Sequence, residues 1–484
     1  MKVNKIKFLT LVSSIIFLSS CDDRLEKVPF DTLAVENAFQ TTKDYENGIR
    51  GIYLQLLDAG YYGSSDAGSM LSFPDVMSDN VIMTSNGRRT KQTLHEWVYS
   101  QDNITEGFYR NAYGPIYLAN VVLNYIDVNN FQGTARANLQ AEARALRAMA
   151  HFDLLRVYGK LPTQTGYTPA SLGVPYNKSI DQNYTPTRDT VESNFQNILD
   201  DLLFAFDNIN ASNGIGRLNK ESVALLLSRV YLYMGGAANY QKVIDFANLV
   251  TTPVAPIANV AGIWTDQNAS GVLLRIPNIP GAGNLNRQIG VTWGQGGVNS
   301  NVPEYAVRFE FMSLFSANDI RRSAYIQTIT STGGVQRNGI KKLFGKVGQF
   351  NGVVDFKILR TEEALLNKAE AQKMLNLDGP ALTTLDQLRN QRYTSFSGGE
   401  AGNALLDAIK LERRLEFAFE YMRWFDLKRW NEPVVRQNTG DRIDGTGQPN
   451  PSGSLVLPAN SNKWQWPFST DMLIRNPNLV QNPQ

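Results

Sequence analysis

Three glutamates, Glu412, Glu416 and Glu420, recur at four-residue spacing and would place three carboxylates on one face of a helix. Paired carboxylates are the groups with which glycosidases cleave sugar linkages, so this spacing raises the hypothesis of a glycan hydrolase. The carboxylates of a glycosidase flank a cleft, however, whereas groups on successive turns of one helix are neighbours along a rod. Basic residues that could neutralise them stand in the same stretch: Arg413, Arg414 and Arg423. A structural ion-pair network is therefore the favoured interpretation.

Nucleophilic and zinc chemistry have few residues to use. His95 and His151 are the only histidines, no ligand spacing relates them, and Cys21 is the only cysteine. The G-x-S-x-G motif of many serine hydrolases is missing from the sequence. We therefore expect neither a His-dependent nucleophile nor a zinc site, and we expect both histidines in packing or surface positions.

Oxygen-bearing side chains at Asp75, Asp79 and Asn80 offer the ligands that Ca²⁺ prefers. Their spacing is not that of an EF-hand loop. A capped turn is the simpler interpretation, and we predict no metal and no cofactor.

Aromatic residues carry the stronger signal for binding, because flat rings stack on the apolar C–H faces of sugars. Trp97, Trp264 and Trp293 lie in loop-rich segments and are the candidate stacking residues, with local packing as the alternative. Further candidates complete an aromatic platform and its polar contacts: Tyr61, Tyr62, Tyr305, Arg88, Arg89, Asp79, Asn80 and Asn86. The other tryptophans are expected in the core: Trp424, Trp430, Trp464 and Trp466.

Helical periodicity recurs along much of the chain. In residues 140–158, Ala141, Ala145 and Ala148 share one face with larger apolar side chains, and their small size permits close helix packing. The basic residues off that face are expected to be solvated or ion-paired: Arg144, Arg147 and Arg156. Residues 108–127 and 189–208 are predicted as further helices that pair with their neighbours.

Two predicted helix-turn-helix units resemble degenerate tetratricopeptide repeats. The first joins residues 218–234 to residues 240–250 and has a helix stop at Gly235-Gly236. The second joins residues 362–375 to residues 381–392, with a break at 378–380. The sequence therefore predicts a mainly α fold built from helical hairpins.

Two stretches of the chain do not show this helical pattern. Residues 251–350 are rich in glycine, carry short apolar bursts and lack helical periodicity, and residues 61–102 are also loop-rich. We expect irregular structure with short strands in both. Because loops on a rigid scaffold usually carry the binding residues, the ligand region is predicted at about 61–102 and 251–350.

The N-terminus is typical of an exported lipoprotein. Basic residues precede an apolar stretch at 8–18 that is too short to span a bilayer. The stretch ends in Leu-Ser-Ser-Cys, which resembles a bacterial lipobox, so residues 1–20 are predicted as a signal peptide and Cys21 as the acylated first residue. Asp22 and Asp23 follow, as in lipoproteins exported to the outer face of the outer membrane.

Charge argues against one class of partner. The formal net charge is +2, and Lys2, Lys5 and Lys7 fall in the segment expected to be removed. The mature chain would therefore carry a charge near −1, which gives no electrostatic reason to bind nucleic acid.

Five strings in order resemble the SusD/RagB family across almost the whole mature chain. They are CDD at 21–23 with NAF at 37–39 and GIY at 51–53, AEARALRA at 141–148 with YGKLP at 158–162, GRLNK at 216–220 with LLSRVYL at 226–232, ERRLEFAFE at 412–420 with RWFDLKRW at 423–430, and NPNLVQNP at 476–483. Departures from the family pattern are modest, such as Phe108 at a position where a tryptophan is usual.

The resemblance implies a single SusD-like domain over residues 21–484, with four tetratricopeptide-like hairpins and an irregular region. It also implies a cell-surface protein without enzymatic activity that binds glycans and delivers them to a SusC-like TonB-dependent transporter. Three alternatives stay open: an oligopeptide or glycopeptide binder of the same fold, a glycan hydrolase, and a scaffold without a soluble ligand.

Overall fold

The computed structural model describes residues 38–63, 69–104, 107–279, 293, 302–331, 333–343, 345–346 and 353–484. Helices dominate these residues, and the strands pair only in twos, so the predicted mainly α fold is confirmed. The predicted signal peptide and Cys21 lie outside the described residues. Within the described ranges, no helix combines the length and apolar character that crossing a membrane requires.

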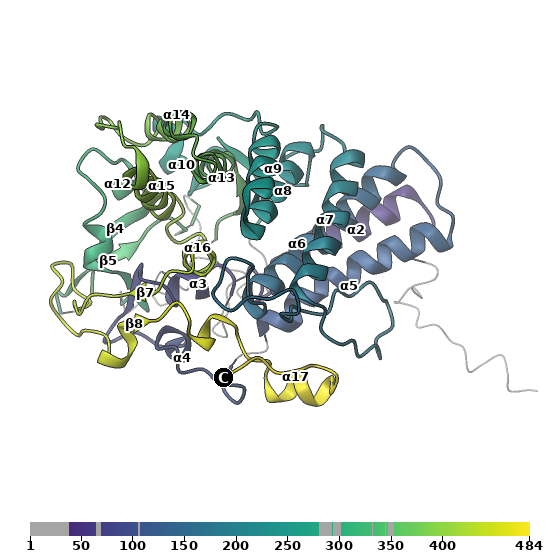
Figure 1. Ribbon diagram of the computed structural model, residues 1–484, viewed down its shortest axis with the longest axis horizontal. Helices are drawn as coiled ribbons and strands as arrows, with labels where there is room; N and C mark the ends of the chain where they lie inside the picture. The colour runs from purple at the N-terminus through teal and green to yellow at the C-terminus, as the bar shows by residue number, and fades with distance from the viewer. Residues whose placement is uncertain are drawn as a thin grey trace, which may run out of the picture.

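Long helices form one end and the middle of the molecule (Figure 1). The end is made of α2 (Thr42–Leu56), α5 (Gly107–Val128), α6 (Arg136–Tyr158) and α7 (Val191–Asn208). The stack continues through α8 (Lys220–Met234), α9 (Ala237–Ala247), α13 (Thr361–Met374), α14 (Asp378–Arg389) and α15 (Gly402–Glu416). Helix α5 packs on α6, α8 on α9 and α13 on α14, which is the predicted hairpin pairing.

Helix α6 lies at the centre of this stack and is enclosed on nearly all sides. Ala141, Ala145 and Ala148 are completely buried, as their small size and spacing predict. The buried Arg147 donates to Asp201 of α7 from Nε at 2.7 Å and from Nη2 at 2.8 Å, and Arg156 pairs with Asp153. Ion pairing therefore lets an enclosed helix carry arginines on its remaining faces.

Two helix boundaries test the helix stops that were predicted from glycine and proline in the sequence. Helix α8 ends at Met234 and is capped by Gly235, whose positive φ of 68° glycine adopts without strain, so this predicted stop is confirmed. The predicted break at 378–380 is wrong, because α14 begins at Asp378 and the turn precedes it. Pro380 stands in the first helical turn, where its missing N–H leaves no bond unmade.

The other end is irregular and holds short elements. Its helices are α3 (Phe73–Val76), α4 (Gln92–His95), α10 (Val260–Ile263), α11 (Phe309–Met312), α12 (Arg321–Tyr325) and α16 (Arg423–Trp430), whereas the short helix α17 (Thr470–Arg475) lies near α5. Its strands are β1 (Val81–Met83), β2 (Val272–Ile276), β3 (Tyr305–Val307), β4 (Ile326–Thr330), β5 (Gln336–Ile340), β6 (Phe356–Arg360), β7 (Val434–Val435) and β8 (Val456–Leu457). The antiparallel pairs are β1 with β3, β2 with β6, β4 with β5, and β7 with β8.

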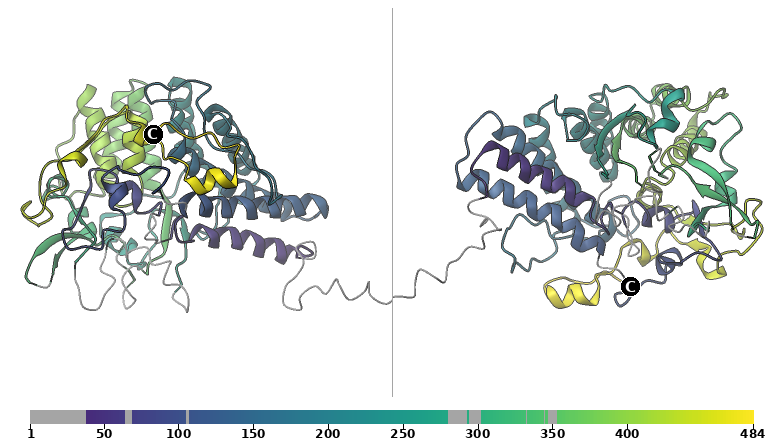
Figure 2. Two further views of the ribbon diagram at one scale, coloured as in Figure 1. Left: turned by 90° about the horizontal axis from the view of Figure 1, so that it is seen from below. Right: turned by 180° about the vertical axis from the view of Figure 1, so that it is seen from behind.

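Strand pairing brings the two loop-rich regions together. Strand β1 comes from the first region and β3 from the second, with Met83 opposite Tyr305. One continuous apolar core runs from the long helices into this irregular end. The hairpin β4–β5 lies at the opposite end of the molecule from α2 and α5, and Figure 2 shows the same separation from two other sides. The core thus holds the hairpin on a rigid body.

Candidate functional site

The glutamates that suggested carboxylate chemistry are buried among arginines. Glu416 accepts hydrogen bonds from Arg392 Nε at 2.8 Å and from Arg360 Nη1 at 3.0 Å, and Glu412 pairs with Arg321 at 2.6 Å. Burial alone would raise the pKa of Glu416, but Arg392 and Arg360 outweigh it and hold that pKa well below its usual value. A carboxylate kept ionised in this way cannot serve as the proton donor of a glycosidase.

Two details of the predicted network are wrong. Helix α15 ends at Glu416, so Glu420 lies in the following turn, where it accepts from Arg360 Nε at 2.9 Å and pairs with Lys342. The neighbouring arginines that were expected to neutralise the glutamates have other partners: Arg413 with Asp426, and Arg414 and Arg423 with Asp79. The cations that do neutralise them come from other elements, which proximity in sequence does not reveal.

The three tryptophans predicted to stack on a ligand are core residues. Trp97 is 5% exposed, and its Nε1 donates to the carbonyl of Met77 at 2.9 Å. Trp264 is buried against the amine of Lys342, and Trp293 packs edge-on against a tyrosine. The expectation that they form an open stacking surface is wrong for this structure, because all three side chains are buried in the core.

The predicted tyrosines are buried as well. The hydroxyls of Tyr61 and Tyr62 both donate to Asp153 Oδ2, at 2.8 and 2.5 Å, which ties this segment to helix α6. Tyr305 lies in β3, where its ring packs against His95 and Trp293. The structure therefore brings several of these aromatics together, but inside the core and not on a surface.

The polar candidates also have structural partners. Asp79 accepts from Arg423 Nε and Nη2, both at 2.8 Å, and Asn80 donates to Asp75 Oδ1 at 2.8 Å. Arg88 has a side chain that is 50% exposed and pairs with Glu304 at 3.2 Å. Among the described residues no group of three His, Cys, Asp or Glu is placed to hold a metal ion. Of the predicted polar contacts, three lie exposed in the turn after β1: Asn86, Arg88 and Arg89.

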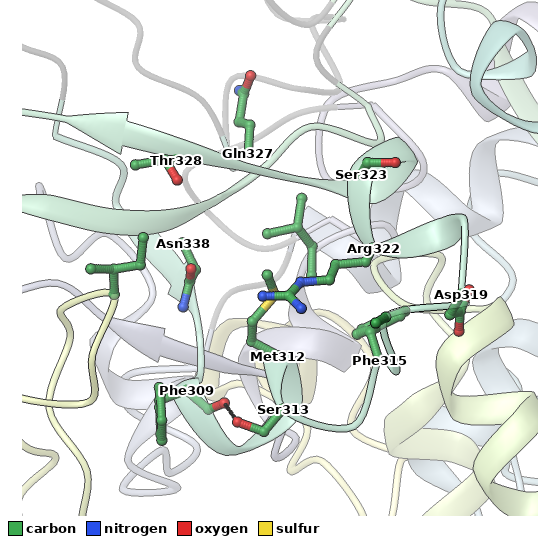
Figure 3. Close-up of a pocket in the computed structure, with 13 residues that line it drawn as sticks. Phe309, Met312, Ser313, Phe315, Asp319, Arg322, Ser323, Gln327, Thr328 and Asn338 are labelled. Carbon is green, nitrogen blue, oxygen red and sulfur yellow. Dashed lines mark hydrogen bonds between the residues drawn. The ribbon is translucent and has the colours of Figure 1, made fainter.

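A pocket of about 690 Å³ opens beside the hairpin β4–β5 (Figure 3). Its wall is formed by α11, the segment that joins α11 to α12, α12, both strands and one residue of a C-terminal loop. The lining residues are Phe309, Met312, Ser313, Phe315, Ala317, Asp319, Arg322, Ser323, Ile326, Gln327, Thr328, Asn338 and Ile443. All but Ile443 fall within the loop-rich region 251–350 that was predicted to hold ligand.

Asn338 is the buried polar group of this pocket. It stands opposite Thr328 in the antiparallel ladder, so both side chains project from the same face of the hairpin. The residue is 3% exposed, and its Nδ2 has no hydrogen-bond partner among the described residues. An unpaired buried donor costs roughly 1–3 kcal/mol. A ligand oxygen bound in the pocket would remove that cost.

Arg322 and Phe309 lie closer to solvent. Arg322 extends from α12 into the pocket toward Met312 (Figure 3). Phe309 is 38% exposed and offers an accessible aromatic ring in the wall. An aromatic face beside several hydrogen-bonding groups is an arrangement that suits a sugar, whose rings have apolar faces and polar edges.

The pocket lies almost entirely within the predicted ligand region at 251–350, but reasoning from the sequence named none of the pocket residues. Asn338 and Arg322 have no distinctive spacing, and a single asparagine or arginine in a loop-rich region is common. Their convergence depends on the register of the hairpin, in which Ile326 pairs with Ile340. No motif in the sequence could have identified them.

A second groove, of about 330 Å³, runs between α5, the segment at 175–186 and α17. Tyr109, Tyr113 and Tyr117 line it from successive turns of α5. The hydroxyl of Tyr113 donates a hydrogen bond to the carbonyl of Pro175 at 2.7 Å. Arg110 is an exposed residue of the same groove, which lies on a different set of elements from the pocket at β4–β5.

Comparisons with known proteins agree with the fold. One family model, described as the SusD family, matches residues 317–484, and another, described as starch-binding associating with outer membrane, matches residues 34–232. SusD-like protein P2 of Formosa agariphila is 24% identical over all of this chain and 99% of its own length. A SusD superfamily protein from Bacteroides thetaiotaomicron superposes with a TM-score of 0.79 at 22% identity, covering 92% of this chain and 100% of that chain.

A further solved structure, a SusD-like carbohydrate binding protein from Bacteroides vulgatus, superposes with a TM-score of 0.76 at 20% identity over 91% of this chain and 98% of that chain. The two family models match both the helical stack and the C-terminal part of the molecule. This chain belongs to the SusD/RagB family, and the resemblance inferred from the five strings is confirmed.

Proposed function

We propose that this protein captures glycan fragments at the cell surface and passes them, unaltered, to a SusC-like TonB-dependent transporter. One observation carries the proposal: the pocket at β4–β5 combines the accessible ring of Phe309 with the buried, unpartnered donor of Asn338. The outer-membrane starch-binding description of the family model and the carbohydrate-binding description of the Bacteroides vulgatus neighbour support the same ligand class.

The proposed layout has a signal peptide at residues 1–20, an acylated Cys21 and a single SusD-like domain over residues 21–484. A lipid at Cys21 would tether the rigid helical stack to the outer membrane and leave the pocket at β4–β5 free to meet ligand. Delivery to the transporter predicts a stable complex, which co-purification of the two full chains would test.

Binding without catalysis agrees with the state of the acidic residues. Glu412 and Glu416 are buried and ion-paired with arginines, and Asp319 in the pocket accepts two hydrogen bonds from Arg321. Glycoside hydrolysis needs one carboxyl group that can donate a proton and a second positioned across the sugar. Incubation with polysaccharides is expected to release no new reducing ends, and their appearance would refute the proposal.

The binding test uses the full chain in detergent and calorimetric titration with oligosaccharides and with oligopeptides. Phe309→Ala is expected to weaken glycan binding roughly fivefold, from a stacking contribution of about 1 kcal/mol. Leu54→Ala is the matched control, since Leu54 is also an exposed apolar residue but lies on α2 at the other end. Saturable binding of peptides and not of glycans would transfer the function to the peptide-binding alternative.

A further inference from the structure

The charges around the pocket at β4–β5 leave one cation without a counter-ion. Among the lining residues only Asp319 and Arg322 are charged. Asp319 is buried, and its oxygens accept from Arg321 Nε at 2.9 Å and from Arg321 Nη2 at 2.8 Å. No carboxylate among the described residues pairs with the guanidinium of Arg322, so this cation is available to an anionic group of a ligand.

Hydrogen-bond donors remain available there, although the hydroxyls of both lining serines already donate. Ser313 donates its hydroxyl hydrogen to the carbonyl of Phe309 at 2.8 Å, the bond drawn in Figure 3, and Ser323 donates to the carbonyl of Ile320 at 3.2 Å. Asn338 Nδ2 has no partner in the described part of the chain, and Arg322, Gln327 and Thr328 are further lining side chains with N–H or O–H groups. A ligand rich in acceptor oxygens fits this set better than one that must donate.

We propose that this pocket selects glycans that carry an anionic group, a uronic-acid carboxylate or a sulfate ester, which Arg322 binds while Asn338 donates to an oxygen of the same sugar. The inference rests on the proposed function and specifies its ligand. Carboxylate and sulfate share two or more acceptor oxygens in one plane or face, the geometry that a guanidinium fork binds through paired hydrogen bonds.

The surface next to the pocket adds one positive and one negative charge and therefore no net charge. A smaller hollow of about 270 Å³ shares Ile443 with the pocket and carries Arg442 and Asp444. Asp444 Oδ1 accepts from Thr446 Oγ1 at 2.7 Å. These opposite charges offset each other, so discrimination between charged and neutral glycans depends on Arg322.

The test compares ligands that differ only in charge. The full chain in detergent is titrated calorimetrically with oligogalacturonate and its methyl ester, and with a sulfated galactan oligosaccharide and its desulfated form. At low salt the anionic member of at least one pair is expected to bind about tenfold more tightly, and added salt to reduce that ratio. The two pairs distinguish a carboxylate from a sulfate as the recognised group.

Variants locate the effect. Arg322→Gln is expected to abolish the preference for the anionic member, and Arg322→Lys to retain part of it, because lysine keeps the charge but loses the planar fork. Arg110→Gln removes the same charge from the second groove and is expected to leave the preference unchanged. Unchanged thermal midpoints would show that all three variants fold.

Three results would overturn the inference or its basis. Equal binding of charged and neutral members by the unaltered protein, or an equal loss of preference in Arg110→Gln, would overturn anion selection by Arg322 and leave glycan binding standing. No binding of any of the four oligosaccharides or of neutral glycans would overturn the proposed function itself.

Discussion

Replacing Glu416 by glutamine tests whether the buried glutamates are structural. Glu416 accepts from Arg392 at 2.8 and 3.1 Å, from Arg360 at 3.0 Å and from Arg321 at 3.3 Å. Glutamine keeps one acceptor but removes the charge and turns an amide N–H₂ toward guanidinium donors. Breaking a buried ion pair by removing one partner costs roughly 3–5 kcal/mol, so Glu416→Gln should lower the free energy of unfolding by about that amount.

Equilibrium unfolding in urea, followed by circular dichroism, measures this loss. The matched control is Glu46→Gln, because Glu46 pairs with Arg50 at 3.7 Å on the surface, with side chains 36% and 60% exposed. Removing that pair should cost at most about 0.5 kcal/mol. The difference between the two variants reports the effect of burial on the same chemical change.

The reasoning fails if Glu416→Gln loses less than about 1 kcal/mol, a loss typical of a partly exposed pair and not of a buried one. Glycan affinity measured well below the unfolding transition should stay within a factor of two. A large loss of affinity with unchanged stability would instead assign Glu416 to ligand binding.

Three further predictions concern single residues. Burial lowers the pKa of His151 in the folded chain to about 3, whereas its pKa in the unfolded chain is near the usual 6.5. As the pH decreases below 6.5, the unfolded chain binds a proton that the folded chain does not, so the free energy of unfolding decreases as the pH decreases. His151→Gln should remove about 2 kcal/mol of the stability lost between pH 6.5 and 5, measured by urea unfolding at each pH, and an unchanged slope would contradict the assignment. Asn338→Leu should change the free energy of unfolding by no more than about 1 kcal/mol, since it removes an unpaired buried donor, yet weaken glycan binding about tenfold in calorimetry; equal binding would exclude Asn338 from the site. Cys21→Ala should release the protein from the outer-membrane fraction and abolish incorporation of labelled fatty acid, whereas retention of the label would show that acylation occurs elsewhere.

The sequence by itself determined the helical scaffold. The alanine spacing of residues 140–158 predicts helix α6, and Gly235 marks the end of α8, because both depend on contacts within a few residues. Strings such as AEARALRA and ERRLEFAFE also identified the family. Local information was sufficient wherever the period of a helix or the conformation of one glycine decided the structure.

Only the tertiary structure decided which loop residues line the pocket at β4–β5. Trp97 lies in a loop-rich segment, yet a carbonyl of Met77 and the guanidinium of Arg436 enclose its ring. Arg322 and Asn338 become neighbours of one pocket because β4 and β5 pair in a particular register. Whether a side chain is exposed, and which side chains meet in one pocket, depends on contacts between residues distant in sequence. Residue type alone does not reveal those contacts.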